Sequence, residues 1–150
     1  MFKGKLLLVN LPVFWPKMPP TGLGCLQAFL SHSGINTEIL DLNNTFYSLA
    51  DDNFKKQWLV SCNVFLEENI LSILRERYLK EYHLAMERMS GYGVVGFSCF
   101  KSNFPATLEV VRLLKERRKD IKIILGGPEI TRQFFKRKGR LNSAVAEGVD

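Results

Sequence analysis

Short apolar runs alternate with helical patterns along the chain. Four of these runs are rich in Leu, Val and Ile, and each ends at a loop that contains a polar residue or glycine. Such runs are typical of parallel strands buried on both faces, with helices as the crossover connections. The predicted strands are Lys5–Val9, Asn36–Asp41, Gly93–Ser98 and Ile121–Leu125.

The spacing of apolar residues predicts the helices between these strands. We expect Thr21 to cap a helix that extends through Ser33, with a buried stripe formed by Leu23, Leu26, Phe29 and Leu30. Gly34 fits the position just past the end of this helix. Residues 51–90 are more than one crossover helix needs, so they predict two or three helices, with a break at Glu67–Asn69. Two further helices are predicted at Pro105–Lys119 and Glu129–Lys136.

These elements predict an α/β domain, a flavodoxin-like (Rossmann-like) three-layer sandwich with a parallel sheet of order 2-1-3-4. The 150 residues suit one domain with a sizeable core. A fifth strand would be expected to begin where the chain stops, at Glu147–Asp150, so residues 1–150 are expected to be a domain cut from a longer protein. The fourth strand then forms an apolar sheet edge, and we expect a homodimer through that edge.

The carboxyl edge of the predicted sheet carries the candidate binding residues. In open α/β sheets, ligands bind at this edge, where the strand order reverses, which here is between the first and third strands. Ser98 and Gly126-Gly127 each follow a strand, so they supply a hydroxyl and room for close approach to the backbone. Taken alone, Gly126-Gly127 is equally consistent with a sharp turn before a helix. The proline-rich loop Asn10–Pro20 also follows a strand and carries Phe14, Trp15 and Met18. Either this loop faces a broad apolar ligand or another domain, or its aromatic side chains cover the core.

The composition predicts a cytoplasmic globular protein, with 46% hydrophobic and 24% charged residues. No apolar run approaches the length of a membrane span or of a signal peptide. The net charge of +6 comes largely from two basic runs, Lys115–Lys119 and Phe135–Arg140. We interpret them as solvated helix ends rather than as a surface for nucleic acid, because no interleaved exposed aromatic residues accompany them. The three cysteines are widely spaced and predict neither a disulfide framework nor a zinc site: Cys25, Cys62 and Cys99.

The common catalytic and nucleotide-binding motifs are absent from the sequence. Gly22-Leu23-Gly24 lacks the third glycine of the dinucleotide fingerprint, and we interpret Asp41 as a helix-capping or loop carboxylate. His32 and His83 lie away from the strand ends, and Ser98 has no base near it in the sequence. We therefore expect no catalytic residue and no metal ligand in this domain.

Several of these segments together resemble the N-terminal cobalamin-binding domain of the cobalamin-dependent radical S-adenosylmethionine enzymes. The resemblance covers nearly the whole chain. Its weaker parts are Lys5–Pro12, Pro19–Gly24 and Glu38–Asp41, and its more specific parts are Val95–Ser98 and Ile123–Glu129.

The resemblance implies that a corrinoid lies over the carboxyl edge of the sheet. Ser98 matches the serine of the family's Ser-x-Leu/Thr element, although Phe100 replaces the usual aliphatic residue or threonine. The Gly-Gly pair matches the glycines beside the nucleotide tail of the cofactor. The cofactor-binding residues implied in this way are Asn10, Pro12, Thr21, Ser98, Cys99, Phe100, Gly126, Gly127, Pro128 and Glu129.

The sequence lacks two motifs that are found in cobalamin-dependent proteins, and their absence affects the functional prediction. The Asp-x-His-x-x-Gly loop that ligates cobalt in methionine synthase-type domains is absent, which implies cobalamin without a protein histidine ligand, or lost binding. The Cys-x3-Cys-x2-Cys motif is also missing, so the iron–sulfur cluster and S-adenosylmethionine are expected only in a C-terminal radical barrel, the expected partner domain. The parent enzyme is expected to be of the methyltransferase type. The alternative is a flavodoxin-like scaffold domain that binds no cofactor and only docks the catalytic domain.

Overall fold

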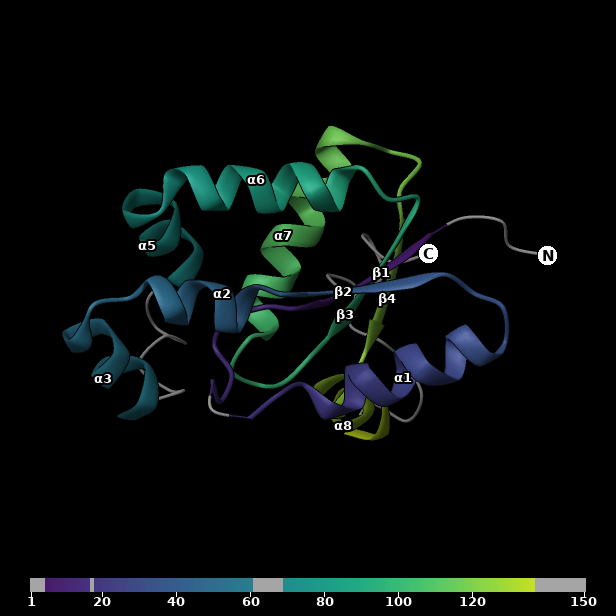
Figure 1. Ribbon diagram of the computed structural model, residues 1–150, viewed down its shortest axis with the longest axis horizontal. Helices are drawn as coiled ribbons and strands as arrows, with labels where there is room; N and C mark the ends of the chain where they lie inside the picture. Colours follow the sequence, from purple (N-terminus) through teal and green to yellow (C-terminus); the bar gives the residue numbers. More distant parts are fainter. Residues whose placement is uncertain (1–4, 17, 61–68, 137–150) are drawn as a thin grey trace.

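The computed structural model describes residues 5–16, 18–60 and 69–136, which form a parallel sheet with helices around it (Figure 1). The strands are β1 (Leu6–Asn10), β2 (Thr37–Asp41), β3 (Val94–Ser98) and β4 (Lys122–Gly126). Their order is β2-β1-β3-β4, and every neighbouring pair is parallel. The predicted α/β fold with sheet order 2-1-3-4 is therefore confirmed.

The helices fill the connections between the strands and follow the last strand. They are α1 (Thr21–His32), α2 (Leu42–Leu49), α3 (Asp52–Val60), α5 (Ile70–Arg77), α6 (Leu79–Ser90), α7 (Phe104–Arg117) and α8 (Pro128–Lys136). Three of them, α3, α5 and α6, lie in the described part of residues 51–90, where two or three helices were predicted. None of the described helices has the length and apolar character needed to cross a membrane.

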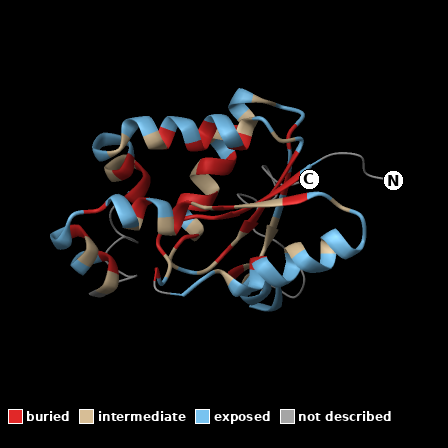
Figure 2. Ribbon diagram, in the orientation of Figure 1, coloured by how far each residue is buried: buried red, intermediate tan, exposed pale blue. Residues whose placement is uncertain are grey.

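The two faces of the sheet are covered very differently. On one face, alternate strand residues such as Leu7, Val95 and Ile123 join a large buried core with residues from α2, α3, α5, α6 and α7. On the other face, α1 contributes to a much smaller cluster made of Leu6, Leu8, Leu23 and Val94, with Leu30 and Ile39 packed against it. Figure 2 shows the consequence, since the strands are largely buried whereas α1 is mostly exposed.

The predicted apolar stripe on α1 is only partly buried. Leu23 is buried and Leu30 is half-buried, as expected, but Leu26 and Phe29 are 42% and 70% exposed. The expectation for these two residues was wrong because α1 packs over the part of the sheet formed by β1 and β2. The rest of the apolar surface of α1 has no described partner. Thr21 is also not the cap of α1. It is the first helical residue, and its hydroxyl donates to the carbonyl of Pro19.

Side-chain and backbone caps fix several helix ends that the sequence indicated. Gly34 adopts a left-handed φ of 76° just after α1, where the N–H groups of Gly34 and Ile35 donate to the carbonyls of Ser31 and Leu30. Asp41 accepts a hydrogen bond from the Asn44 N–H, which confirms its capping role. The helix that it caps, α2, was not predicted.

The predicted break between helices is confirmed at Asn69, whose side chain accepts from the N–H groups of Leu71 and Ser72 at the start of α5. Other expectations fall outside the described residues. They concern Cys62, Glu67 and Glu68, the basic run beyond Lys136, and the fifth strand at Glu147–Asp150.

Candidate functional site

A groove lies between α1 and the turn from β4 to α8, on the face of the sheet that is less well covered. Its volume is about 360 Å³, within the range of about 300–1,000 Å³ that is usual for small-molecule sites. We call it the α1–β4 groove. It is lined by Leu8, Gly22, Leu23, Leu26, Gly96, Phe97, Ser98, Phe100, Ile124, Gly126, Gly127 and Pro128.

The alternation of side chains along the strands builds the floor of the groove. Leu8, Gly96 and Ile124 are register partners across β1, β3 and β4, and they share one face. Ser98 pairs with Gly126 on the same face, one step nearer the carboxyl edge. Gly96, at the centre of the floor, is buried, and the Leu8 side chain lies beside it. A Cβ on Gly96 would come within 3.0 Å of the Leu8 side chain.

A second hollow of about 180 Å³ continues the groove along the proline-rich loop. It shares Gly22, Leu23, Ser98 and Phe100 with the groove and adds Phe14, Met18, Pro19, Pro20 and Thr21. The rings of Phe14 and Phe100 stack at 4.2 Å, and both residues are half-buried, so Phe14 packs against the loop that follows β3. Trp15 and Met18 remain 44% and 55% exposed, which leaves apolar surface at this edge for a ligand or another domain.

Asn103 joins the loops that follow β1 and β3. It is fully buried, and its Nδ2 donates to the carbonyl oxygens of Leu11 and Ser98 at 3.1 and 3.0 Å. Its Oδ1 accepts from the Phe100 N–H at 2.8 Å. A further bond runs from the Ser102 hydroxyl to the carbonyl of Val13. The side-chain amide of Asn103 therefore fixes the backbone of both loops at the ligand-binding edge.

The two glycines after β4 have different surroundings. A Cβ on Gly126 would meet no atom within 4 Å and would project into open space. Gly127 has a φ of 99°, and a Cβ there would lie 2.8 Å from the carbonyl oxygen of Cys99. Gly126 thus leaves the groove open, whereas Gly127 allows β4 to turn closely past the end of β3.

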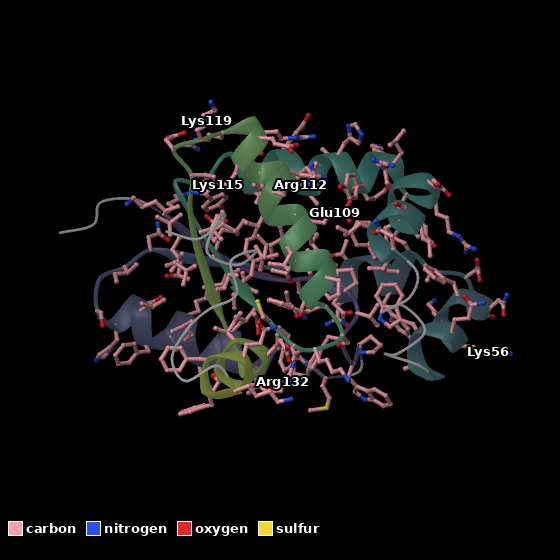
Figure 3. The ribbon with its side chains drawn as sticks, turned by 180° about the vertical axis from the view of Figure 1, so that it is seen from behind. Lys56, Glu109, Arg112, Lys115, Lys119 and Arg132 are labelled. Carbon is pink, nitrogen blue, oxygen red and sulfur yellow. The ribbon has the colours of Figure 1, made fainter. Side chains whose placement is uncertain are left out.

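Glu129 anchors the start of α8 against the end of β3. Its backbone N–H donates to the Cys99 carbonyl at 3.0 Å, and its buried carboxylate accepts from Arg132 and Gln133. The bond from Arg132 holds the pKa of Glu129 below its ordinary value, so the carboxylate is charged at neutral pH. Arg132 itself extends from α8 and is exposed (Figure 3).

The structure brings six of the ten predicted cofactor-binding residues to the two hollows. They are Thr21, Ser98, Phe100, Gly126, Gly127 and Pro128. The other four lie elsewhere. Asn10 is buried and donates to Asp41, Pro12 lines a small void under α6, and Glu129 is held as described above. Cys99 is buried, and desolvation raises the pKa of its thiol to about 12, so it remains protonated.

Other candidate groups lie away from these hollows. His32 and His83 are exposed on helices, and Cys25 is also exposed. Within the ranges that the structure describes, no group of three or more His, Cys, Asp or Glu side chains could hold a metal ion. Arg112 and Lys115 extend from α7, and Lys119 lies past its end (Figure 3). Arg112 there pairs with Glu116, and Arg118 pairs with Asp120.

Sequence reasoning missed several residues that build the site. Leu8, Leu23, Leu26 and Ile124 gave no signal beyond strand or helix patterning. Gly96 did give one, since glycine inside a strand often marks a close approach of a ligand or backbone. Asn103 gave none for its bond to Leu11, because that partner lies in a distant segment that meets Asn103 only in the folded chain, whereas Ser98 and Phe100 are near it in the sequence.

Comparison with protein families gives a match to the B12 binding domain over residues 72–148. This region is just over half of the chain, and its described part contains α6, β3, α7, β4 and α8. It therefore supplies the β3 and β4 side of the groove. Searches of curated proteins and of solved structures gave no match.

Proposed function

The chain belongs to the B12-binding domain family, and on that premise we propose that it binds a corrinoid at the carboxyl edge of its sheet. The nucleotide tail of the corrinoid would occupy the α1–β4 groove, and the ring would lie over the loop that follows β1. The observation that carries this proposal is the uncovered groove beside Ser98 and Gly126.

The residues present suit such a ligand. The groove is enclosed mainly by apolar side chains, as expected for a site that takes an aromatic base. Glycine at positions 22 and 126 keeps its wall and edge free, since a Cβ on either residue would meet no atom within 4 Å. Side chains at these positions would project into space that the tail needs.

The neighbouring loops would position the ring. Asn103 and the Phe14–Phe100 stack hold the backbone after β1 and β3 in one arrangement. The Ser98 hydroxyl lines both hollows and supplies a hydrogen-bonding group where tail and ring would meet. When bound, the corrinoid supplies methyl-transfer chemistry, and the protein supplies binding and orientation.

We further propose that this domain serves a cytoplasmic radical S-adenosylmethionine enzyme of the methyltransferase type. Its partner would be a C-terminal barrel that holds the iron–sulfur cluster and S-adenosylmethionine. The exposed Trp15 and Met18 at the binding edge supply an apolar surface for that contact. The resemblance of Val95–Ser98 and Ile123–Glu129 to that enzyme family supports this assignment.

A spectroscopic experiment tests corrinoid binding directly. The chain is incubated with hydroxocobalamin and desalted, and the visible spectrum of the protein fraction is recorded. Retention of the corrinoid in a 1:1 ratio is the expected result. A colourless protein fraction that is folded by circular dichroism would refute the proposal and favour a scaffold domain that docks the catalytic domain without a cofactor.

A further inference from the structure

The α1–β4 groove offers almost no hydrogen-bonding groups to a ligand. Apart from Ser98, its side-chain surface is apolar and comes from Leu8, Leu23, Leu26, Phe97, Phe100, Ile124 and Pro128. Among the described residues that line it, Ser98 is the one with a polar side chain. The backbone of β3 on its floor pairs with β1 on one side and β4 on the other, so the sheet uses those polar groups.

This lining discriminates between aromatic bases of similar size. A buried polar group without a partner carries its full desolvation cost, whereas an apolar ring gains from burial. Resting on the proposed function, we propose that the groove selects corrinoids with a benzimidazole base over those with an adenine base. Dimethylbenzimidazole presents a largely apolar ring and two methyl groups. Adenine presents an exocyclic amino group and additional ring nitrogens that this lining leaves unpaired.

Leu26 is the specificity-determining residue that is most readily tested. It lies on α1, lines the groove and is 42% exposed, so a polar replacement is compatible with folding. Leu26→Gln adds a donor and an acceptor to the wall. Phe29→Gln is the matched control, because Phe29 lies on the same helix, is 70% exposed and does not line the groove. Ile124→Thr on the floor is a second variant that places a hydroxyl in the groove.

The experiment compares three corrinoids in visible-absorption titrations of the full chain. They are cobalamin, its analogue with an adenine base, and cobinamide, which lacks the nucleotide tail. Cobalamin is expected to bind about tenfold more tightly than each of the other two. Leu26→Gln and Ile124→Thr are expected to reduce the ratio between the two bases about threefold or more, and Phe29→Gln is expected to leave it unchanged.

Each contrary outcome has a distinct meaning. Equal affinities for cobalamin and its adenine analogue would overturn the selectivity, and corrinoid binding would stand. Equal affinity for cobinamide as well would show that the tail does not use the groove, which also overturns the inference. If none of the three corrinoids binds to folded protein, the proposed function itself fails.

Discussion

Gly126 and Gly127 are neighbours in the sequence, but their α-carbons have opposite surroundings. Gly126→Val places a branched side chain in the open groove, so we expect a loss of cobalamin affinity of about 1.4 kcal/mol or more, which is tenfold in Kd. The free energy of unfolding should change by less than about 0.5 kcal/mol. Titration with hydroxocobalamin and urea denaturation measure the two effects.

Two matched variants control this result. Gly93→Val makes the same replacement at the amino end of β3, where a Cβ also meets no atom within 4 Å, and it should leave affinity unchanged. Gly127→Ala should instead destabilise the fold by about 1–3 kcal/mol, because its left-handed φ and its contact with Cys99 both disfavour a side chain. Wild-type affinity in Gly126→Val would contradict the placement of the tail.

Asn103 concentrates three backbone hydrogen bonds on one buried amide. Asn103→Ala leaves the carbonyls of Leu11 and Ser98 and the N–H of Phe100 without this partner. We expect the free energy of unfolding to fall by about 3 kcal/mol, since buried groups left unpaired are costly. The check is a lower urea midpoint with an unchanged m value. Asn69→Ala, which removes an exposed cap, should cost only about 1 kcal/mol. Equal losses of the free energy of unfolding in Asn103→Ala and Asn69→Ala would contradict the role of Asn103 in joining the two loops.

At the scale of single elements, Asp41 determines where β2 ends and α2 begins. Its carboxylate accepts from the Asn44 N–H and from the side chains of Asn44 and Asn10. Asp41→Ala should lower the free energy of unfolding by about 1–2 kcal/mol, whereas Asp41→Asn should retain most of the stability, because asparagine caps helices well. Thermal unfolding followed by circular dichroism makes the comparison. A loss in Asp41→Asn as large as in Asp41→Ala would show that capping is not the main contribution of this residue.

For the whole molecule, the described sheet ends at β4, and that edge is partly apolar. Ile124 is 52% exposed on this strand, beside the exposed Lys122. We propose that two copies pair through this edge, since an unpaired strand is a template for another chain. Sedimentation velocity should show dimer that increases with concentration, and Ile124→Lys should reduce it. A monomer at every concentration, identical in both proteins, would contradict the proposal.

The sequence by itself determined the order of the strands and of the helices other than α2 in the described chain, and the edge at which a site could form. This was possible because apolar runs, caps and glycine turns are local signals. It identified Ser98 and Gly126 beside the groove, because residues that directly follow parallel strands must lie at the carboxyl edge.

Only the tertiary structure decided which apolar residues are covered and which line a groove. The spacing on α1 is that of a buried stripe, yet Leu26 and Phe29 are exposed because α1 packs toward β2 and leaves the β3 and β4 side open. The same applies to Asn103, whose role depends on loops that meet only after the sheet has formed. Burial and long-range hydrogen bonding depend on where other segments pack, and a local sequence pattern does not specify the positions of those segments.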